Sequence, residues 1–292
     1  MKTCIVIAGP TASGKTAVAI DIARHFKTAI ISADSRQCFR EMNIGVAKPS
    51  PAELQQVHHY FINSHSIHDE VNAAVFEQYA LHAANEVFQQ HDHVVLAGGT
   101  GLYIRAFCEG LDDMPPVSPG IRQQIIEQYE QQGLAWLQQQ VQQQDPLYYA
   151  TGEMQNPQRL IRALEVLQAT GRSIRSYQQG KKTTRDFRII KLGLDLPKPE
   201  LHDRINARVD AMIEQGLVQE VRELSPYRHL NALQTVGYSE IFDYLDAQCS
   251  LDEAIDRIKT NTRQYAKRQL TWFKKDPDIK WVPRVEALHS II

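Results

Sequence analysis

One segment constrains the fold of this chain more than any other. Residues 9–16, GPTASGKT, match the phosphate-binding pattern G-x-x-x-x-G-K-[ST]. An apolar run rich in β-branched residues, 4–8, precedes the motif, and residues 17–26 follow it with apolar side chains at helical spacing. A strand, a glycine loop and a helix in this order are the context that the pattern requires. The alternative is a glycine-rich turn that matches by chance, and the flanking strand and helix argue against it.

The residue types of the motif predict its chemistry. Gly9 and Gly14 let the backbone bend so that successive N–H groups point inward, and the N-terminus of the following helix adds partial positive charge. Lys15 adds a full positive charge, and the Thr16 hydroxyl suits a Mg²⁺ ion that bridges phosphate oxygens. The motif therefore predicts a ligand with at least two linked phosphates.

Composition narrows the class of protein. The chain has 292 residues, 43% hydrophobic and 23% charged, with a net charge of −2, which is typical of globular proteins and excludes wholesale disorder. The N-terminal apolar run stops at Gly9 and no later run is long enough to span a membrane, so we expect a cytoplasmic protein with no membrane partner. The four cysteines form no C-x-x-C pair, which argues against structural zinc and disulfides.

Polar residues follow two further predicted strands. Residues 28–33 form the first of these strands, and Asp34 follows its end. Residues 93–97 form the other, which leads into the glycine-rich segment 98–103 with Thr100. Because ligand-handling residues gather at the carboxyl ends of strands in open α/β sheets, we expect Asp34 to lie near the phosphates and the 98–103 turn to fold over the same crevice. Turn and capping roles are the alternatives for both residues.

The middle of the chain changes character. Three prolines in 111–119 mark a linker, apolar residues then recur at helical spacing over 121–141 and 156–170, and a strand resumes at 187–195. The sequence therefore predicts an α/β fold, a P-loop NTPase-like parallel sheet flanked by helices, with an all-helical insertion. The predicted domains are a P-loop catalytic core, residues 1–109 and 187–292, and a helical insertion, residues 110–186.

Two basic stretches stand out in a chain of nearly balanced charge. Residues 159–191 hold nine Lys or Arg against two acids. Residues 257–275 hold seven Lys or Arg and no acid, with Tyr265, Trp272 and Phe273 among them. Cations meet phosphates and aromatic rings stack on bases, so both stretches favour nucleic acid. Solvated helix faces with buried aromatic residues are the alternative.

Two reaction classes fit these features. A nucleotide hydrolase or kinase usually ends an apolar strand in an Asp that helps to hold Mg²⁺, whereas here the strand at 93–97 runs into glycines and the acid, Asp34, lies one strand earlier. A small-molecule kinase whose Asp34 holds the acceptor stays open. In the second class a diphosphate is the leaving group, and Asp34 removes a proton from the nucleophile. The basic stretches make a nucleic acid the natural nucleophile.

Seven segments along the chain form a set that is more specific than the glycine loop alone: 9–16, 31–37, 43–49, 98–103, 156–166, 236–238 and 262–273. In these segments, and along nearly its full length, the chain resembles the tRNA dimethylallyltransferase (tRNA isopentenyltransferase) family, bacterial type. Cys38 departs from the family, which often has a bulky aliphatic residue there, and we expect only a packing change. The chain stops soon after Trp281 without a zinc-finger tail, which fits the bacterial type.

The resemblance implies the reaction and its partners. A dimethylallyl group would move from dimethylallyl diphosphate to N6 of the adenosine on the 3′ side of the tRNA anticodon, with Mg²⁺ held by Thr16. The implied catalytic residues are Asp34 as general base, and Thr100 and Arg208 on the diphosphate. The diphosphate, or a nucleotide such as ATP at the same motif, would be bound by Gly9, Pro10, Thr11, Ala12, Ser13, Gly14, Lys15 and Thr16. The tRNA anticodon stem-loop would contact Asp34, Ser35, Arg36, Gln37, Thr100, Arg122, Gln158, Arg159, Leu160, Ile161 and Arg162.

Three alternative functions make different demands on the chain. A prenyltransferase acting on free adenine nucleotides would need neither the insertion nor the basic stretches. A small-molecule kinase would turn over ATP. An RNA-binding module would bind tRNA without chemistry, so that the substitution Asp34→Asn would be silent. Nothing in the sequence indicates an obligate partner chain, so a monomer is expected.

Overall fold

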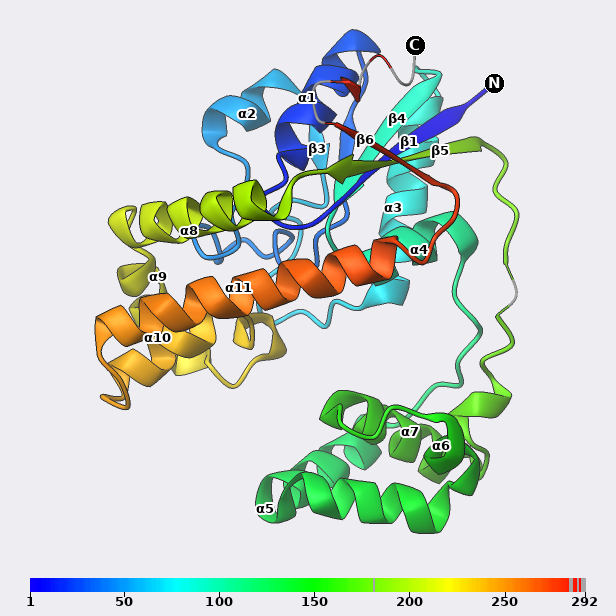
Figure 1. The fold of residues 1–292 in the computed structure, drawn as a ribbon. Helices are drawn as coiled ribbons and strands as arrows, with labels where there is room; N and C mark the ends of the chain where they lie inside the picture. Colours follow the sequence, from blue (N-terminus) through cyan, green and yellow to red (C-terminus); the bar gives the residue numbers. More distant parts are fainter. Residues whose placement is uncertain (181, 284–285, 288, 290–292) are drawn as a thin grey trace. The chain divides into compact units, whose positions relative to one another are not determined.

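One parallel sheet organises the larger part of the chain. The computed structural model describes residues 1–180, 182–283, 286, 287 and 289. The strand order is β3-β2-β4-β1-β5-β6, and every neighbouring pair is parallel (Figure 1). The strands are β1 (Thr3–Ala8), β2 (Ile30–Ser32), β3 (His59–Tyr60), β4 (His93–Gly98), β5 (Arg188–Asp195) and β6 (Ile279–Pro283). The predicted α/β fold with a parallel sheet is confirmed.

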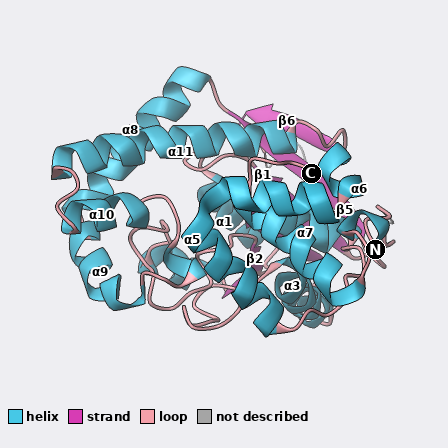
Figure 2. Ribbon diagram, turned by 90° about the horizontal axis from the view of Figure 1, so that it is seen from below, coloured by secondary structure: helices cyan, strands magenta, loops and turns pink. Residues whose placement is uncertain are grey.

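Helices cover both faces of this sheet, and β1 shows the consequence. Cys4, Val6 and Ala8 face the layer that contains α3 and α4, whereas Ile5 and Ile7 face the layer that contains α1, and all five are fully buried. A strand that is buried on both faces is apolar throughout, which is why residues 4–8 form a continuous apolar run. The helices of the part of the chain that contains the sheet are among those drawn in cyan in Figure 2. They are α1 (Lys15–His25), α2 (Pro51–Gln56), α3 (Ala73–Phe88), α4 (Gly101–Glu109), α8 (Lys198–Glu214), α9 (Leu217–Leu224), α10 (Tyr238–Leu245) and α11 (Leu251–Phe273), with the 3₁₀ turns η2 (Ser225–Tyr227) and η3 (Asn231–Leu233).

Three loops leave the sheet at neighbouring positions of its carboxyl edge. The register places Ala8 of β1 opposite Gly98 of β4, and Ser32 of β2 opposite Ala97 of β4. The glycine loop after β1, the turn that begins at Asp34 and the turn after β4 therefore start side by side. The crevice outside such strand ends is where open α/β sheets bind ligands.

A second compact unit, residues 110–183, is entirely helical, and residues 1–109 with 184–292 form the first unit. The second unit contains α5 (Pro119–Gln144), α6 (Pro146–Thr151), α7 (Pro157–Thr170) and the 3₁₀ turn η1 (Ile174–Ser176). Gly133 interrupts α5 with a φ of +76°, a left-handed value that suits glycine, so α5 consists of two helical segments. Lys181, one of the cations of the first basic stretch, lies outside the described residues.

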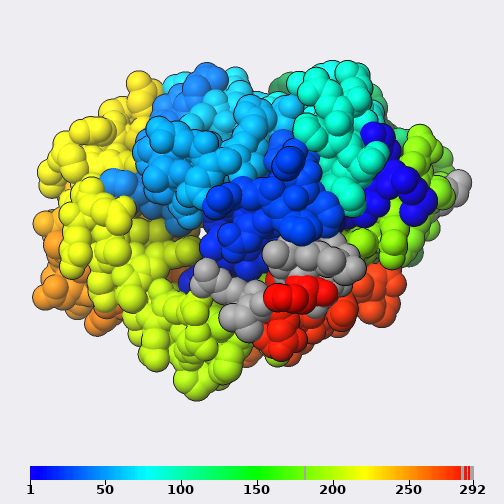
Figure 3. Space-filling model, turned by 90° about the horizontal axis from the view of Figure 1, so that it is seen from above, coloured from blue at the N-terminus to red at the C-terminus, as the bar shows by residue number. Residues whose placement is uncertain are grey.

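On the face that Figure 3 shows, the blue region of α1 lies near the yellow-green region of α8. Arg208 of α8 contacts the glycine loop that precedes α1, where its Nη1 donates to Thr11 Oγ1 over 3.2 Å. Within the described ranges, no helix is both long enough and apolar enough to cross a membrane.

Candidate active site

A cavity of about 480 Å³ opens at the carboxyl edge of the sheet, entirely within the first unit. Its walls come from the glycine loop and α1, the strand ends at Asp34 and Gly98, the loop 44–50, and the helices α8 and α11. Of the residues predicted to bind ligand or act in catalysis, those that line it are Thr11, Ala12, Gly14, Lys15, Thr16, Asp34, Gln37 and Arg208. One cavity therefore brings together the predicted phosphate loop and the predicted base.

The glycine loop has the bent backbone that the sequence predicted. Gly14 has a φ of +88° and immediately precedes α1, and Ala12 has a φ of +64°, which is uncommon for a residue with a side chain. Such strained positions persist where the surrounding structure holds them, often at ligand sites. The first turn of α1 carries no acidic residue, so its free N–H groups and helix dipole favour an anion at this end of the cavity.

Two cations face this end of the cavity. Burial and the nearby Arg208 guanidinium lower the pKa of Lys15 to about 7, and Asp34 opposes the shift. The Lys15 Nζ donates to the Pro10 carbonyl over 2.6 Å. Burial also lowers the pKa of Arg208, again against the attraction of Asp34. A polyanionic ligand bound here would offset the electrostatic repulsion between these two partly buried positive groups.

The lowered pKa of Lys15 predicts proton uptake when an anion binds. Below pH 7 the ammonium is already charged, whereas at pH 8 most of it is neutral and a bound diphosphate should restore its proton. We expect calorimetry with inorganic diphosphate at pH 8, in buffers of different ionisation enthalpy, to show about one more proton taken up by the wild type than by Lys15→Arg. The arginine variant is the control because its charge does not titrate. The difference should vanish at pH 6; equal uptake by both proteins at pH 8 would contradict the assignment.

Asp34 presents one fixed and one free carboxylate oxygen. Its Oδ1 accepts from the backbone N–H of Arg36 over 2.9 Å and from that of Gln37 over 3.3 Å, which closes a turn at the end of β2. Among the residues that the structure describes, Oδ2 accepts no hydrogen bond. The turn thus orients the side chain while leaving an oxygen able to accept a proton.

Thr100 supports the Asp34 turn and does not line the cavity. Its hydroxyl accepts from the backbone N–H of Ser35 over 3.0 Å and also forms a hydrogen bond with the phenol of Tyr265. Burial and the Asp34 charge raise the pKa of Tyr265 to about 12, so the phenol stays neutral. Thr100 therefore contacts the base side of the cavity, and its predicted contact with the diphosphate stays a prediction.

Sequence reasoning missed the support of the loop 43–48. The carboxylate of Glu220, on α9, accepts from three successive N–H groups, those of Asn43, Ile44 and Gly45, over 2.8–3.0 Å, and from the Tyr238 hydroxyl over 2.6 Å. The side chain of Gln37 donates to the carbonyls of the same loop at positions 46 and 47. The Val236–Tyr238 segment was noted for the resemblance, yet only the tertiary structure pairs it with this loop.

Three residues predicted to bind the diphosphate form the buried part of the glycine loop, on the side away from the cavity. Gly9, Pro10 and Ser13 are buried and do not line the cavity. A Cβ at Gly9 would lie 3.1 Å from Ser13 Oγ, so the glycine lets the loop close on the serine. Ser13 Oγ is buried without a hydrogen-bond partner among the described residues.

The predicted tRNA-binding residues of the helical unit divide into two groups. Arg122 and Arg162 are partly exposed and both form ion pairs with the buried carboxylate of Glu165, and Arg122 also donates to Gln158 over 3.1 Å. This cluster and the exposed Arg159 form a basic surface at the start of α7.

The second group consists of buried apolar residues, and its predicted contact with tRNA stays a prediction that could involve only the backbone. Leu160 and Ile161 are completely buried in the core of the helical unit, so their side chains are inaccessible to RNA. They fix α7, whose first turn begins after the cap that Asn156 forms with the N–H of Arg159.

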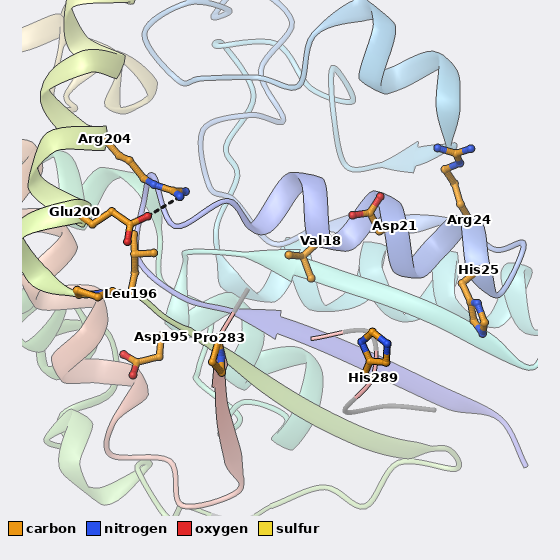
Figure 4. A pocket seen from close by; sticks show the side chains of 11 residues that line it. Val18, Asp21, Arg24, His25, Asp195, Leu196, Glu200, Arg204, Pro283 and His289 are labelled. Atoms are coloured by element: carbon orange, nitrogen blue, oxygen red, sulfur yellow. Dashed lines mark hydrogen bonds and ion pairs between the residues drawn. The ribbon is translucent and has the colours of Figure 1, made fainter. Parts of the chain in front are cut away.

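A larger cavity, of about 920 Å³, lies elsewhere in the first unit (Figure 4). Its lining is Val18, Asp21, Arg24, His25, Asp195, Leu196, Pro197, Glu200, Arg204, Pro283 and His289. Acids and bases are mixed in it, and Arg204 is already paired with Glu200 over 2.7 Å. It contains neither the glycine loop nor Asp34, so we place the active site in the smaller cavity.

Similarity to known proteins identifies the family of this chain. The family model described as IPP transferase matches residues 37–276. The chain belongs to the IPP transferase family. It is 50% identical to a tRNA dimethylallyltransferase of Christiangramia forsetii, over 95% of this chain and 92% of that protein. It is 45% identical to tRNA dimethylallyltransferase 1 of Bacteroides thetaiotaomicron, over 96% of this chain and 91% of that protein. The predicted family is confirmed.

Solved structures of IPP transferases share the fold. The full-length tRNA isopentenylpyrophosphate transferase of Bacillus halodurans is 33% identical with a TM-score of 0.72, covering 100% of this chain and 94% of that chain. A eukaryotic dimethylallyltransferase acting on tRNA is 26% identical with a TM-score of 0.78, covering 97% of this chain and 74% of that chain. The smaller share of the eukaryotic chain means that it contains residues with no counterpart here.

Proposed function

We propose that this protein transfers a dimethylallyl group from dimethylallyl diphosphate to N6 of the adenosine on the 3′ side of the anticodon in tRNA. The observation that carries the proposal is that one cavity is lined both by the cationic glycine loop and by a carboxylate with a free oxygen. A leaving diphosphate and a proton-bearing nucleophile need those two environments at a short separation. The names of the relatives support tRNA as the acceptor.

Residues of the cavity account for both the leaving group and the proton in this step. The N6–C1 bond forms as the C1–O bond of the donor breaks, and the bonding electron pair leaves with the diphosphate. Asp34 Oδ2 takes the proton from N6, whose lone pair is a poor nucleophile because it is delocalised into the adenine ring. Lys15 and Arg208 stabilise the charge on the leaving group. The adenine must leave its stack to reach the cavity, and a closed cavity protects the allylic centre from water.

Mg²⁺ fits the oxygen ligands at the glycine loop. The Thr16 hydroxyl lines the cavity beside Lys15, and the Asp34 carboxylate lines it as well. Mg²⁺ prefers oxygen ligands and is usually held by one or two protein groups together with substrate phosphates. Thr16 would hold the ion, which would neutralise diphosphate charge when bound.

Exposed aromatic and basic groups support an RNA acceptor. On α11, Tyr265 and Trp272 are 36% and 38% exposed, and the Arg268 guanidinium lies 5.8 Å from the centre of the Tyr265 ring. The basic surface of the helical unit, Arg122, Arg159 and Arg162, offers phosphate contacts. In this proposal the enzyme acts as a monomer in the cytoplasm on the anticodon stem-loop.

Incorporation of labelled dimethylallyl from its diphosphate into unmodified tRNA tests the proposal. We expect label in tRNA, and none in a matched transcript whose target adenosine is replaced by guanosine. AMP as the acceptor and an ATP-only reaction run alongside. Label in AMP with none in tRNA would favour a nucleotide prenyltransferase, and ATP consumption without transfer would favour a kinase.

A further inference from the structure

Gln269 is a polar residue on the buried face of α11, which it shares with Ala266 and Phe273. Its side chain is only 7% exposed, whereas Lys267 and Arg268 beside it are exposed. Its Oε1 accepts from the backbone N–H of Thr11 over 2.8 Å, and its Nε2 donates to the Gly99 carbonyl over 2.9 Å. Both ends of the amide are thus used, and each binds the backbone of a different active-site loop.

We propose that Gln269 is a positioning residue for the transfer reaction, holding the glycine loop and the Gly99–Thr100 turn at one fixed separation. The inference rests on the proposed function, because it assigns the two loops to the leaving group and to the base. Gln269 touches neither reacting atom in that scheme and acts through the backbone of both loops.

The amide continues the sheet where the sheet itself ends. The last registered pair of β1 and β4 is Ala8 opposite Gly98. Beyond this pair, Gln269 bonds Thr11, three residues after Ala8, and Gly99, the residue after Gly98. A side-chain amide has the same donor and acceptor as a peptide group, so it can replace the missing ladder contact.

Each loop leads directly to a reacting group. Thr11 accepts from Arg208 through its hydroxyl, which ties the glycine loop to the second diphosphate cation. Thr100 follows Gly99 and accepts from the N–H of Ser35, next to Asp34. The distance between the donor carbon and the Asp34 carboxylate therefore depends on the separation of the two loops, which Gln269 sets. A displacement of about 1 Å in such a geometry can cost about 100-fold in rate.

The site is shaped for this amide. A Cβ at Gly99 would lie 2.2 Å from Gln269 Nε2, so only glycine lets the amide approach the carbonyl. A carboxylate at position 269 would keep an acceptor for Thr11 and lose the donor for Gly99. A carboxylic acid would regain that donor, because its O–H can donate to the carbonyl. Substitution by glutamate therefore creates a switch that protonation can reverse.

The test compares Gln269→Glu and Gln269→Met with the wild type in the labelled tRNA assay, with kcat and KM measured separately between pH 5.5 and 8.5. Gln264→Met, on the exposed part of the same helix, is the matched control. We expect kcat at pH 8 to fall about 100-fold in both Gln269 variants with KM for tRNA within threefold. Relative to wild type, Gln269→Glu should regain activity as the pH falls, whereas the deficit of Gln269→Met should not change.

The outcomes separate this inference from the proposed function. If wild type transfers no label, the proposed function fails and so does the assignment that rests on it. If wild type transfers and both variants keep kcat within threefold, or if both show the same pH-independent deficit, Gln269 does not position the loops. Should Gln269→Met not fold, the comparison of Gln269→Glu at two pH values within one folded protein decides the question.

Discussion

Replacing Asp34 by asparagine should lower kcat for dimethylallyl transfer about 1,000-fold, within the range that a general base contributes. Asparagine has nearly the same shape, and its Oδ1 can still accept from the N–H groups of Arg36 and Gln37 that close the turn. Its amide group replaces the free Oδ2 and cannot take a proton. The substitution therefore removes basicity and keeps the local fold, so affinity for tRNA should stay within a few-fold.

Single-turnover kinetics with saturating tRNA and donor measure this step without product release. Asp21→Asn is the matched control, because it removes the same charge from the exposed side of α1. We expect the control to transfer at the wild-type rate. An unchanged rate in Asp34→Asn would remove Asp34 from its role, and tRNA binding without any transfer by the wild type would favour the RNA-binding module.

The sequence could predict that Asp34 and the glycine loop meet, because both follow apolar runs that read as buried strands. Parallel strands end at one edge, so residues that follow them share a crevice whatever the loops do. The strands β3 and β6 were not predicted. β3 has only two residues, which is too short to show a pattern, and β6 is an edge strand beside β5.

The contacts of Gln269 and Glu220 could not be predicted, for a different reason. Gln269 lies 258 residues from Thr11 and 170 from Gly99, and nothing local distinguishes its amide from those of exposed glutamines. A weak signal existed, because Gln269 falls on the buried face of α11 together with Ala266 and Phe273. A polar residue at such a position needs a buried partner.

At Leu160 and Ile161 the helical periodicity and the family resemblance gave opposite expectations. Periodicity placed both on the apolar face of residues 156–170, and the resemblance counted both among the tRNA contacts. The structure follows the periodicity and buries them. Arg159 and Arg162, on the other side of the helix, remain accessible, so the apolar positions of α7 form the core of the helical unit and the basic positions face outward.

Gly98→Ala should be the most destabilising small substitution at the active site. A Cβ at Gly98 would lie 2.1 Å from the Ala33 carbonyl oxygen and 2.7 Å from its Cα, and both are backbone atoms that cannot rotate away. Ala33 is held opposite Gly98 by two hydrogen bonds, from its N–H to the Ala97 carbonyl over 2.8 Å and from the Thr100 N–H to its own carbonyl over 3.1 Å. To remove this clash, β2 and β4 must move apart at their carboxyl ends, next to Asp34 and Thr100.

Overpacking of this kind costs about 3 kcal/mol, which corresponds to a fall in Tm of about 6–12 °C for a unit of this size. Scanning calorimetry measures the shift, and inorganic diphosphate identifies the transition of the first unit by raising its Tm. Gly120→Ala is the control, because its nearest neighbour would be 3.8 Å away and alanine favours a helix. A shift below about 2 °C in Gly98→Ala would show that the sheet edge yields freely. We expect the Tm to fall by about 6–12 °C and dimethylallyl transfer to be lost even at temperatures where the variant is folded. Together these results would show that the contact between β2 and β4 also sets the position of Asp34.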